Sequence, residues 1–435
     1  MTSISRRSLM TGAAVATGST ALGRSVVKAA PSYQRISTGR KAQGEKIQLD
    51  FSNIFGSVPG VAPGATKPPM DELIEAFNEQ SQTVEVLNNV PGATYDDLLL
   101  KLQADLAAGG GPDMATIPWT SMSTAVNGFG LQSLDDKLGD RMTNITPLIS
   151  EFAWPLVTFT DGKIKGLPLG LSSPMLYYNA DVFETAGVNP DEAFRTWESL
   201  AATFPALKEA IGDGSVITMG SGKDWPAQTI VQSNGGRILS EDGTTFVFDS
   251  AEGKEALETI ARFDADGFMD HSANTEINPN FFAGFTAIMP GSTGVTGIRA
   301  QSGFNVGTST WPTFGDKPRR SSTGGCFLAI FSQDEAKYDA IAEFLEFFAG
   351  PVGYPIWHKV GYINISTQEL DIIPGQEPAY QQFREGLERE TNWPGSRGVE
   401  IQQVWRGFLD RMWTDGLPVE EGVAQAKEEM TSLIS

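Results

Sequence analysis

The stretch from residue 47 to residue 117 decides the fold, beginning Ile47-Gln48-Leu49-Asp50-Phe51 and ending Asp113-Met114-Ala115-Thr116-Ile117. Apolar residues alternate with polar ones in the first of these segments and again around Val84 and Val86, as they do in β-strands. Between the strands, apolar side chains recur at helical spacing, at Leu73, Ile74 and Phe77 and at Leu98, Leu99, Leu102 and Leu106. This β-α-β-α-β order predicts an α/β fold whose sheet is mostly parallel and covered by helices.

The remainder of the chain repeats the alternation. Residues 175–178 and 216–219 are expected to form strands, and a helix begins near Trp197 that Pro205 is expected to kink or end. Further helical stripes lie around Leu257, Phe344 and Val423. Because 435 residues exceed the size of an ordinary domain, we expect two α/β regions.

Composition excludes several classes of function. Asp and Glu number 53 against 32 Lys and Arg, so the net charge of −21 disfavours a nucleic-acid binder. The single cysteine, Cys326, excludes an intrachain disulfide and a multi-cysteine metal cluster, and two histidines leave little for a zinc site, so no metal is expected. Cys326 lies in an apolar, strand-like run and is expected to be a buried, unreactive thiol.

The N-terminus has the pattern of an export signal. Arg6 and Arg7 precede a short, weakly apolar segment that is too short to anchor in a membrane, which is typical of a twin-arginine (Tat) signal peptide over residues 1–30. A disordered basic leader of a cytosolic protein is the alternative. Residues 31–44 are expected to be a polar linker. No cysteine lies near the signal, so we expect a protein released into the periplasm without a lipid anchor.

Catalytic and cofactor motifs are incomplete. The glycines 109–111 lack the spacing of a dinucleotide fingerprint and fit a helix stop better. Residues 220–223 form only half of a phosphate loop, and Ser292 misses the serine-hydrolase elbow by one position. No cofactor is therefore predicted.

Two longer segments carry a family resemblance. One runs from Gly166 to Asn179 (GLPLGLSSPMLYYN), and the other combines residues 344–347 with the run from Trp357 to Ile365 (WHKVGYINI). Together they resemble the extracellular solute-binding proteins of sugar importers (family 1). The resemblance covers roughly residues 45–433 and is greatest to members that bind glycerol 3-phosphate in the periplasm.

The resemblance implies a two-lobed periplasmic-binding-protein fold, with a hinge of crossing segments and a ligand cleft between the lobes. Lobe one is expected to comprise residues 45–168 plus 326–368, and lobe two residues 169–325 plus 369–435. The crossings are expected near residues 168–172, 323–327 and 367–374.

The resemblance also implies a set of ligand-binding residues. Carried over by position, they are Tyr95, Trp119, Ser172, Ser292, Gly325, Tyr362 and Arg397, with Trp225 as an aromatic wall. Glycerol-phosphate binders have a glutamate at the position of Trp119, and a tryptophan there favours a larger ligand with a face on which it can stack. Arg397 either holds a phosphate or directs a sugar hydroxyl, and its alternative is a surface ion pair.

The expected function is capture rather than catalysis. We expect a monomer that closes on a carbohydrate or polyol by hinge motion and delivers it to the permease of an ABC importer. Glycerol 3-phosphate or a glycerophosphodiester is the second ligand class. An exported carbohydrate-active enzyme is the remote alternative, because such an enzyme needs two facing carboxylates and the implied site contains none.

Overall fold

The computed structural model describes residues 46–58, 65, 67–219, 224–270, 279–294 and 302–434. The predicted signal peptide (1–30), the predicted linker (31–44) and the half phosphate loop (220–223) lie outside the described residues.

The predicted β-α-β-α-β run forms most of a five-stranded sheet. Its order is β2-β1-β3-β10-β4, where β1 is Ile47–Ser52, β2 Val84–Asn89, β3 Met114–Pro118, β4 Leu167–Ser172 and β10 Gly324–Ile330. β1 pairs in parallel with β2 and β3, whereas β10 pairs antiparallel with both of its neighbours. Four of the five strands therefore share one direction, as predicted, and β10 opposes them.

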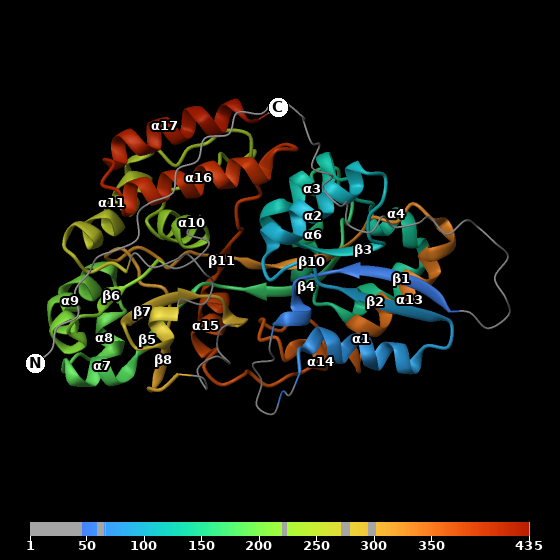
Figure 1. Cartoon of the computed structure of the whole chain (residues 1–435), viewed down its shortest axis with the longest axis horizontal. Coiled ribbons are helices and arrows are strands. Elements are labelled where there is room, and N and C mark those ends of the chain that lie inside the picture. The colour runs from blue at the N-terminus through green and yellow to red at the C-terminus, as the bar shows by residue number, and fades with distance from the viewer. Residues whose placement is uncertain are drawn as a thin grey trace, which may run out of the picture. The chain divides into compact units, whose positions relative to one another are not determined.

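Helices cover both faces of this sheet. Figure 1 shows α1 (Pro69–Gln80), α13 (Tyr338–Ala349) and α14 (Gly353–His358) on one face, and α2 (Tyr95–Ala107), α3 (Met122–Gly128) and α6 (Trp154–Val157) on the other. The Thr94 side chain and Asp97 form a capping box that fixes the start of α2. The apolar stripes found in the sequence face the sheet, and Leu73, Leu102 and Phe344 are buried in this first core.

A second sheet has the order β6-β7-β5-β8, with β5 at Met175–Asn179, β6 at Ser215–Ile217, β7 at Thr286–Gly291 and β8 at Val306–Ser309. β6 and β7 are parallel, and β5 is antiparallel to β7 and β8. Among the described strands, β5 is thus the one that opposes the others in its sheet, as β10 is in the first. β5 enters directly after β4, and β10 enters directly after β9 (Ser321–Ser322), which pairs with β11 (Leu387–Glu388). Each of the two antiparallel strands is therefore the first that the chain forms after it leaves the other large sheet: β5 follows β4 of the first sheet, and β10 follows β8 of the second by way of β9.

A second core surrounds this sheet. α9 (Trp197–Ile211) packs on β6, while α10 (Asp224–Ser233), α11 (Ala251–Ala265), α16 (Gly398–Trp413) and α17 (Val419–Ser432) pack on one another. Pro205 lies inside α9, so of the two predicted effects, a kink or an end of the helix, the end does not occur. The capping box of Thr196 and the burial of residues on both sides of Pro205 hold the helix together despite the missing N–H group.

The described residues also form shorter helices: α4 (Leu134–Leu138), α5 (Met142–Ile145), α7 (Ala180–Thr185), α8 (Pro190–Ala193), α12 (Pro279–Phe282) and α15 (Glu377–Glu385). None of the helices within the described ranges combines the length and the apolar character that crossing a membrane requires.

Candidate functional site

The junction between the two sheets is built from glycines. In the β4–β10 ladder, Gly324 pairs with Ser172 and Cys326 pairs with Gly170. Gly325 between them has a φ of +122°, and a Cβ atom there would lie 2.1 Å from the Gly170 carbonyl oxygen. The position therefore requires glycine for the backbone itself.

Two tryptophans bracket this junction, one from each core. Trp119, in the 3-10 turn Trp119–Ser121 that follows β3, donates its indole N–H to the Gly324 carbonyl at 2.9 Å. Trp225, in the first turn of α10, donates its indole N–H to the Thr323 carbonyl at 2.9 Å. Both N–H groups are occupied by backbone, so these side chains can offer a ligand their ring surfaces only.

The two indoles differ in how much surface remains. Trp119 is 5% exposed and stacks on Phe327 with ring centroids 5.6 Å apart. Trp225 is half-buried and lies so close to Gly324 that a Cβ on that glycine would be 2.4 Å from the indole Cζ2. Trp225 therefore has more ring surface available than Trp119.

The predicted serines also meet at the junction. The Ser172 Oγ lies 2.8 Å from the Ser292 Oγ and 3.1 Å from the Thr293 Oγ1. The Tyr177 hydroxyl donates to the Ser292 carbonyl at 2.6 Å, which fixes the chain at the end of β7. These hydroxyls form a compact polar group where β4 leaves the first sheet.

The predicted tyrosines join the group from the first core. The ring of Tyr362 covers Gly170, and the rings of Tyr362 and Tyr95 lie 6.1 and 6.3 Å from that of Phe55. The Tyr95 side chain lowers the pKa of the Cys326 thiol, but the effect of burial is larger. Burial raises the pKa of Cys326 to about 12, so the prediction of a buried thiol is confirmed.

Arg397 is the predicted residue that the structure does not bring to this group. It stands at the N-cap position of α16 without a capping hydrogen bond from its side chain. That side chain is 48% exposed, and its Nε lies 3.7 Å from the Glu400 Oε1 one turn further along the same helix. The surface ion pair, which the sequence left as the alternative, is the arrangement observed.

A charge cluster that sequence reasoning missed lies beside Tyr95 and Trp225. The Arg406 Nη1 lies 2.7 Å from the Asp96 Oδ2, and its Nε lies 3.1 Å from the Asp224 Oδ1. Burial and the negative charge of Asp224 raise the pKa of Glu390 well above its ordinary value. Asp96 and Arg406 are 310 residues apart, so no local pattern could have indicated their pairing.

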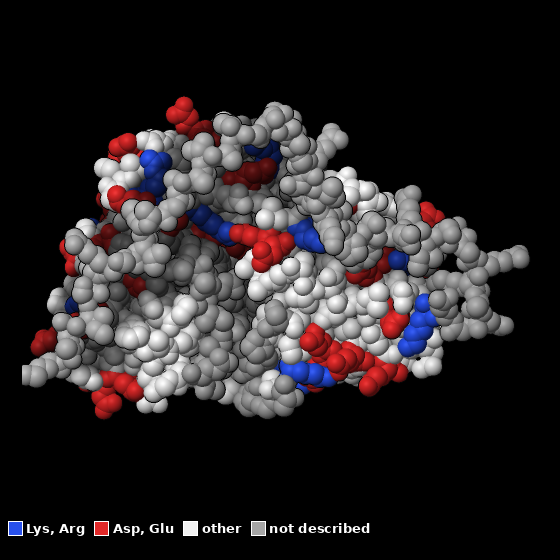
Figure 2. Space-filling view, in the orientation of Figure 1, with Lys and Arg blue, Asp and Glu red and all other residues white. Residues whose placement is uncertain are grey.

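A cavity of about 430 Å³ is lined by segments of both cores. The first core contributes Ser123 and residues 158–160 to the lining. The rest of the lining comes from Gln232, residues 236–243, Arg320 and residues 388–392. Figure 2 shows basic and acidic atoms side by side in the middle of the face on which Figure 1 labels β11. Of the residues that line the cavity, Arg320 pairs with Glu388 at 3.3 Å. None of the predicted ligand-binding residues lines this cavity.

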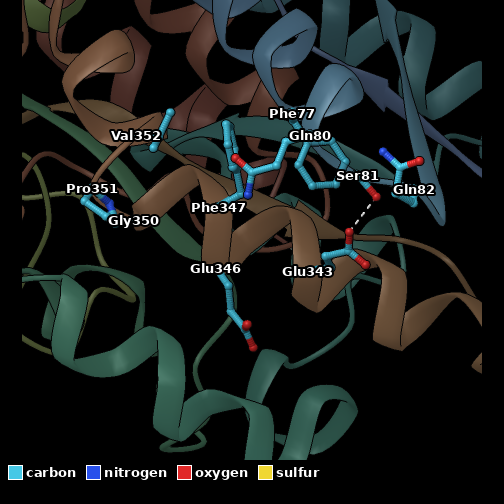
Figure 3. A pocket seen from close by; sticks show the side chains of 10 residues that line it. All are labelled: Phe77, Gln80, Ser81, Gln82, Glu343, Glu346, Phe347, Gly350, Pro351 and Val352. Carbon is cyan, nitrogen blue, oxygen red and sulfur yellow. Dashed lines mark hydrogen bonds between the residues drawn. The ribbon is translucent and has the colours of Figure 1, made fainter.

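A second cavity, of about 420 Å³, lies between the end of α1 and α13 (Figure 3). Its two carboxylates are already bound. Glu343 accepts hydrogen bonds from Ser81 and Thr83, and Glu346 pairs with Arg141 at 2.9 Å. These contacts stabilise the first core, and they leave neither carboxylate without a protein partner. Within the described ranges, no group of three or more His, Cys, Asp or Glu side chains is placed to hold a metal ion.

Comparison with known proteins gives matches to one family. The family model described as bacterial extracellular solute-binding protein matches residues 72–382. The sn-glycerol-3-phosphate-binding periplasmic protein UgpB of Yersinia enterocolitica is 30% identical over 385 residues, covering 78% of this chain and 84% of that protein.

Two solved structures share the fold. UgpB of Mycobacterium tuberculosis in complex with glycerophosphocholine superimposes with a TM-score of 0.75 at 22% identity, over 89% of this chain and 98% of the other. The cyclic α-maltosyl-1,6-maltose binding protein of Arthrobacter globiformis gives 0.70 at 19% identity, over 89% and 99%.

Proposed function

The chain belongs to the bacterial extracellular solute-binding proteins, which bind solutes and are not enzymes, and on this premise we propose that it captures a carbohydrate or polyol for an ABC importer. The ligand is held at the junction of the two sheets and is delivered to the permease. The lobes, with the boundaries expected from the sequence, close on the ligand by bending at the crossing strands β4 and β10.

The observation that supports a carbohydrate or polyol is the pair of tryptophans that donate hydrogen bonds to the crossing segment. Trp119 and Trp225 approach residues 323–324 from the two cores and have no free N–H, so their contribution is apolar ring surface. Ring surface suits the C–H faces of a sugar, and the hydroxyls of Ser172 and Ser292 suit its hydroxyl groups. The structural relative from Arthrobacter globiformis binds a cyclic maltosyl sugar.

Glycerol 3-phosphate or a glycerophosphodiester is the second candidate. It is favoured by the sequence relative that binds glycerol 3-phosphate and by the structural relative in complex with glycerophosphocholine. A phosphate needs a cation at the site, and Arg397 is the only cation in the predicted set. Its ion pair with Glu400 on the exposed start of α16 therefore favours the neutral ligand.

Ligand identity is tested by a thermal-shift screen of the mature protein against sugars, polyols and glycerol phosphates, because a ligand that binds only the folded state raises Tm. Calorimetry at low and high salt then separates the two classes. A sugar is expected to bind equally at both salt concentrations, whereas binding of a phosphate through a partly exposed arginine weakens with salt. Raised Tm with glycerol 3-phosphate alone, together with salt-sensitive binding, would contradict the sugar proposal.

Variants of the site residues give the second test. For a sugar, Trp119→Ala and Trp225→Ala are each expected to weaken binding by about 2–4 kcal/mol, which is roughly 30- to 1,000-fold. The matched Phe variants keep one aromatic ring and lose the pyrrole ring with its N–H, so they are expected to weaken binding less than the Ala variants do. Arg397→Lys is expected to have little effect on a sugar, and a dominant effect of this variant would indicate a phosphate ligand.

The location of the mature protein completes the proposal. The family is extracellular or periplasmic, and the twin-arginine signal at Arg6 and Arg7 supports export to the periplasm in folded form.

A further inference from the structure

We propose that Arg406 is a positioning residue of the ligand site, which fixes the first turns of α2 and α10 against each other and thereby sets the placement of Tyr95 and Trp225. The inference rests on the proposed function, because it concerns two walls of the same site.

The connectivity of Arg406 is the first argument. The two acids that it binds are sequence neighbours of the two aromatic residues. Asp96 directly follows Tyr95 at the start of α2, and Asp224 directly precedes Trp225 at the start of α10. A single guanidinium therefore ties the helix start that carries one aromatic ring to the helix start that carries the other.

The geometry of the guanidinium is the second argument. Its Nη1 binds Asp96 at 2.7 Å while its Nε binds Asp224 at 3.1 Å, so different N–H groups serve the two carboxylates at the same time. The planar fork of arginine supports such a double contact, whereas the compact ammonium of lysine is a point charge on a flexible stem. Arg406→Lys therefore keeps the charge and removes the fixed geometry.

Burial is the third argument, because it separates this cluster from ordinary surface pairs. The side chain of Asp224 is 4% exposed, and those of Arg406 and Asp96 are 25% and 38% exposed. Gln402, one turn before Arg406 on α16, also donates to Asp224. The Arg406–Asp224 contact is therefore shielded from water and holds its geometry better than the exposed pairs of the chain, whereas the Arg406–Asp96 contact is partly open to solvent.

The position of the pair between the two cores is the fourth argument. α2 packs in the first core through Leu98 and Leu102, whereas α10 and α16 pack in the second through Ile230 and Trp405. The Asp96–Arg406 contact is therefore one of the places where the two cores meet. Loss of this contact is expected to let Tyr95 and Trp225 move relative to each other, without disrupting either core.

The first measurement needs no ligand. The protein is labelled with 5-fluorotryptophan, and the ¹⁹F resonance of Trp225 is assigned with Trp225→Phe. Arg406→Lys is expected to shift or broaden this resonance while Tm stays close to that of the wild type. The control is Lys427→Gln, which breaks the similarly exposed Lys427–Asp249 pair (2.8 Å) within the second core and is expected to leave the Trp225 resonance unchanged.

The second measurement uses calorimetry with maltose and sn-glycerol 3-phosphate as probes. Arg406→Lys is expected to weaken the probe that binds by tenfold or more, and Lys427→Gln by less than twofold. An unchanged Trp225 resonance in Arg406→Lys, or a shifted resonance with unchanged affinity, would overturn the positioning role. If neither probe binds the wild type while the resonance shifts as expected, the ligand is neither maltose nor glycerol 3-phosphate, and the placement of Trp225 by Arg406 stands.

Discussion

Replacing Gly325 by alanine separates a ligand-binding role at this position from a backbone role. The sequence resemblance places Gly325 among the ligand-binding residues, whereas the structure gives it a φ of +122° and a Cβ direction blocked at 2.1 Å by the Gly170 carbonyl oxygen. Trp119 Nε1 would lie 2.8 Å from the same Cβ atom. Alanine therefore forces the β4–β10 ladder apart at the point where the chain enters the first sheet.

The expected loss of stability follows from two terms. Backbone strain in a region that essentially only glycine adopts costs about 1–3 kcal/mol. Overpacking against atoms that cannot move freely adds about 1–3 kcal/mol. The sum is about 2–6 kcal/mol, and an unfolding entropy near 2.1 cal/mol/K per residue converts this to a fall in Tm of about 2–7 °C for a chain of 435 residues.

Gly407→Ala is the matched control. Gly407 is an exposed residue inside α16 with no atom within 4 Å of its added Cβ, so alanine there is expected to stabilise the chain by about 0.5–1 kcal/mol. Calorimetric unfolding of both variants checks the opposite signs. A Gly325→Ala variant with unchanged Tm and weakened ligand binding would refute the backbone role and favour the ligand-binding one.

Three further outcomes are expected. Because burial raises the pKa of Cys326 to about 12, native protein at pH 8 is expected to react with a thiol reagent about 1,000-fold more slowly than the denatured chain, and rapid native labelling would contradict the burial. The folded chain holds the Glu390 proton more tightly than the unfolded chain, so the stability from this group falls as pH rises above about 4.5. Glu390→Gln is therefore expected to match the wild type in Tm at pH 4 and exceed it at pH 7, each unit of raised pKa contributing about 1.4 kcal/mol; equal Tm values at both pH values would oppose this. Arg6→Lys with Arg7→Lys is expected to leave the precursor in the cytoplasm, as a cell-fractionation blot would show, and normal periplasmic levels in a strain without the twin-arginine translocase would count against the signal.

The local architecture follows from the residue pattern alone. The alternation at β1 and β2 and the helical stripes through Leu73, Leu102 and Phe344 all correspond to elements of the structure, because side-chain periodicity reflects which face of one element is buried. The same local reasoning could not decide between a kink and an end at Pro205, where packing on both sides of the proline outweighs one missing hydrogen bond and the helix continues. The family resemblance added the candidate site, and most of those residues do meet at one junction.

How those residues are used depends on contacts that form only in the folded chain. The indole N–H of Trp119 bonds a carbonyl 205 residues away, and Arg406 bonds an aspartate 310 residues away, so neither pairing leaves a periodic trace in the sequence. The reversed direction of β5 and β10 and the glycine requirement at position 325 likewise arise where the chain passes between the two sheets. Arg397 shows the converse, since a residue that matches the family motif forms an ion pair on its own helix. Hydrogen bonds and charges between distant segments depend on the distance and orientation of their groups, and these exist only once both cores have formed.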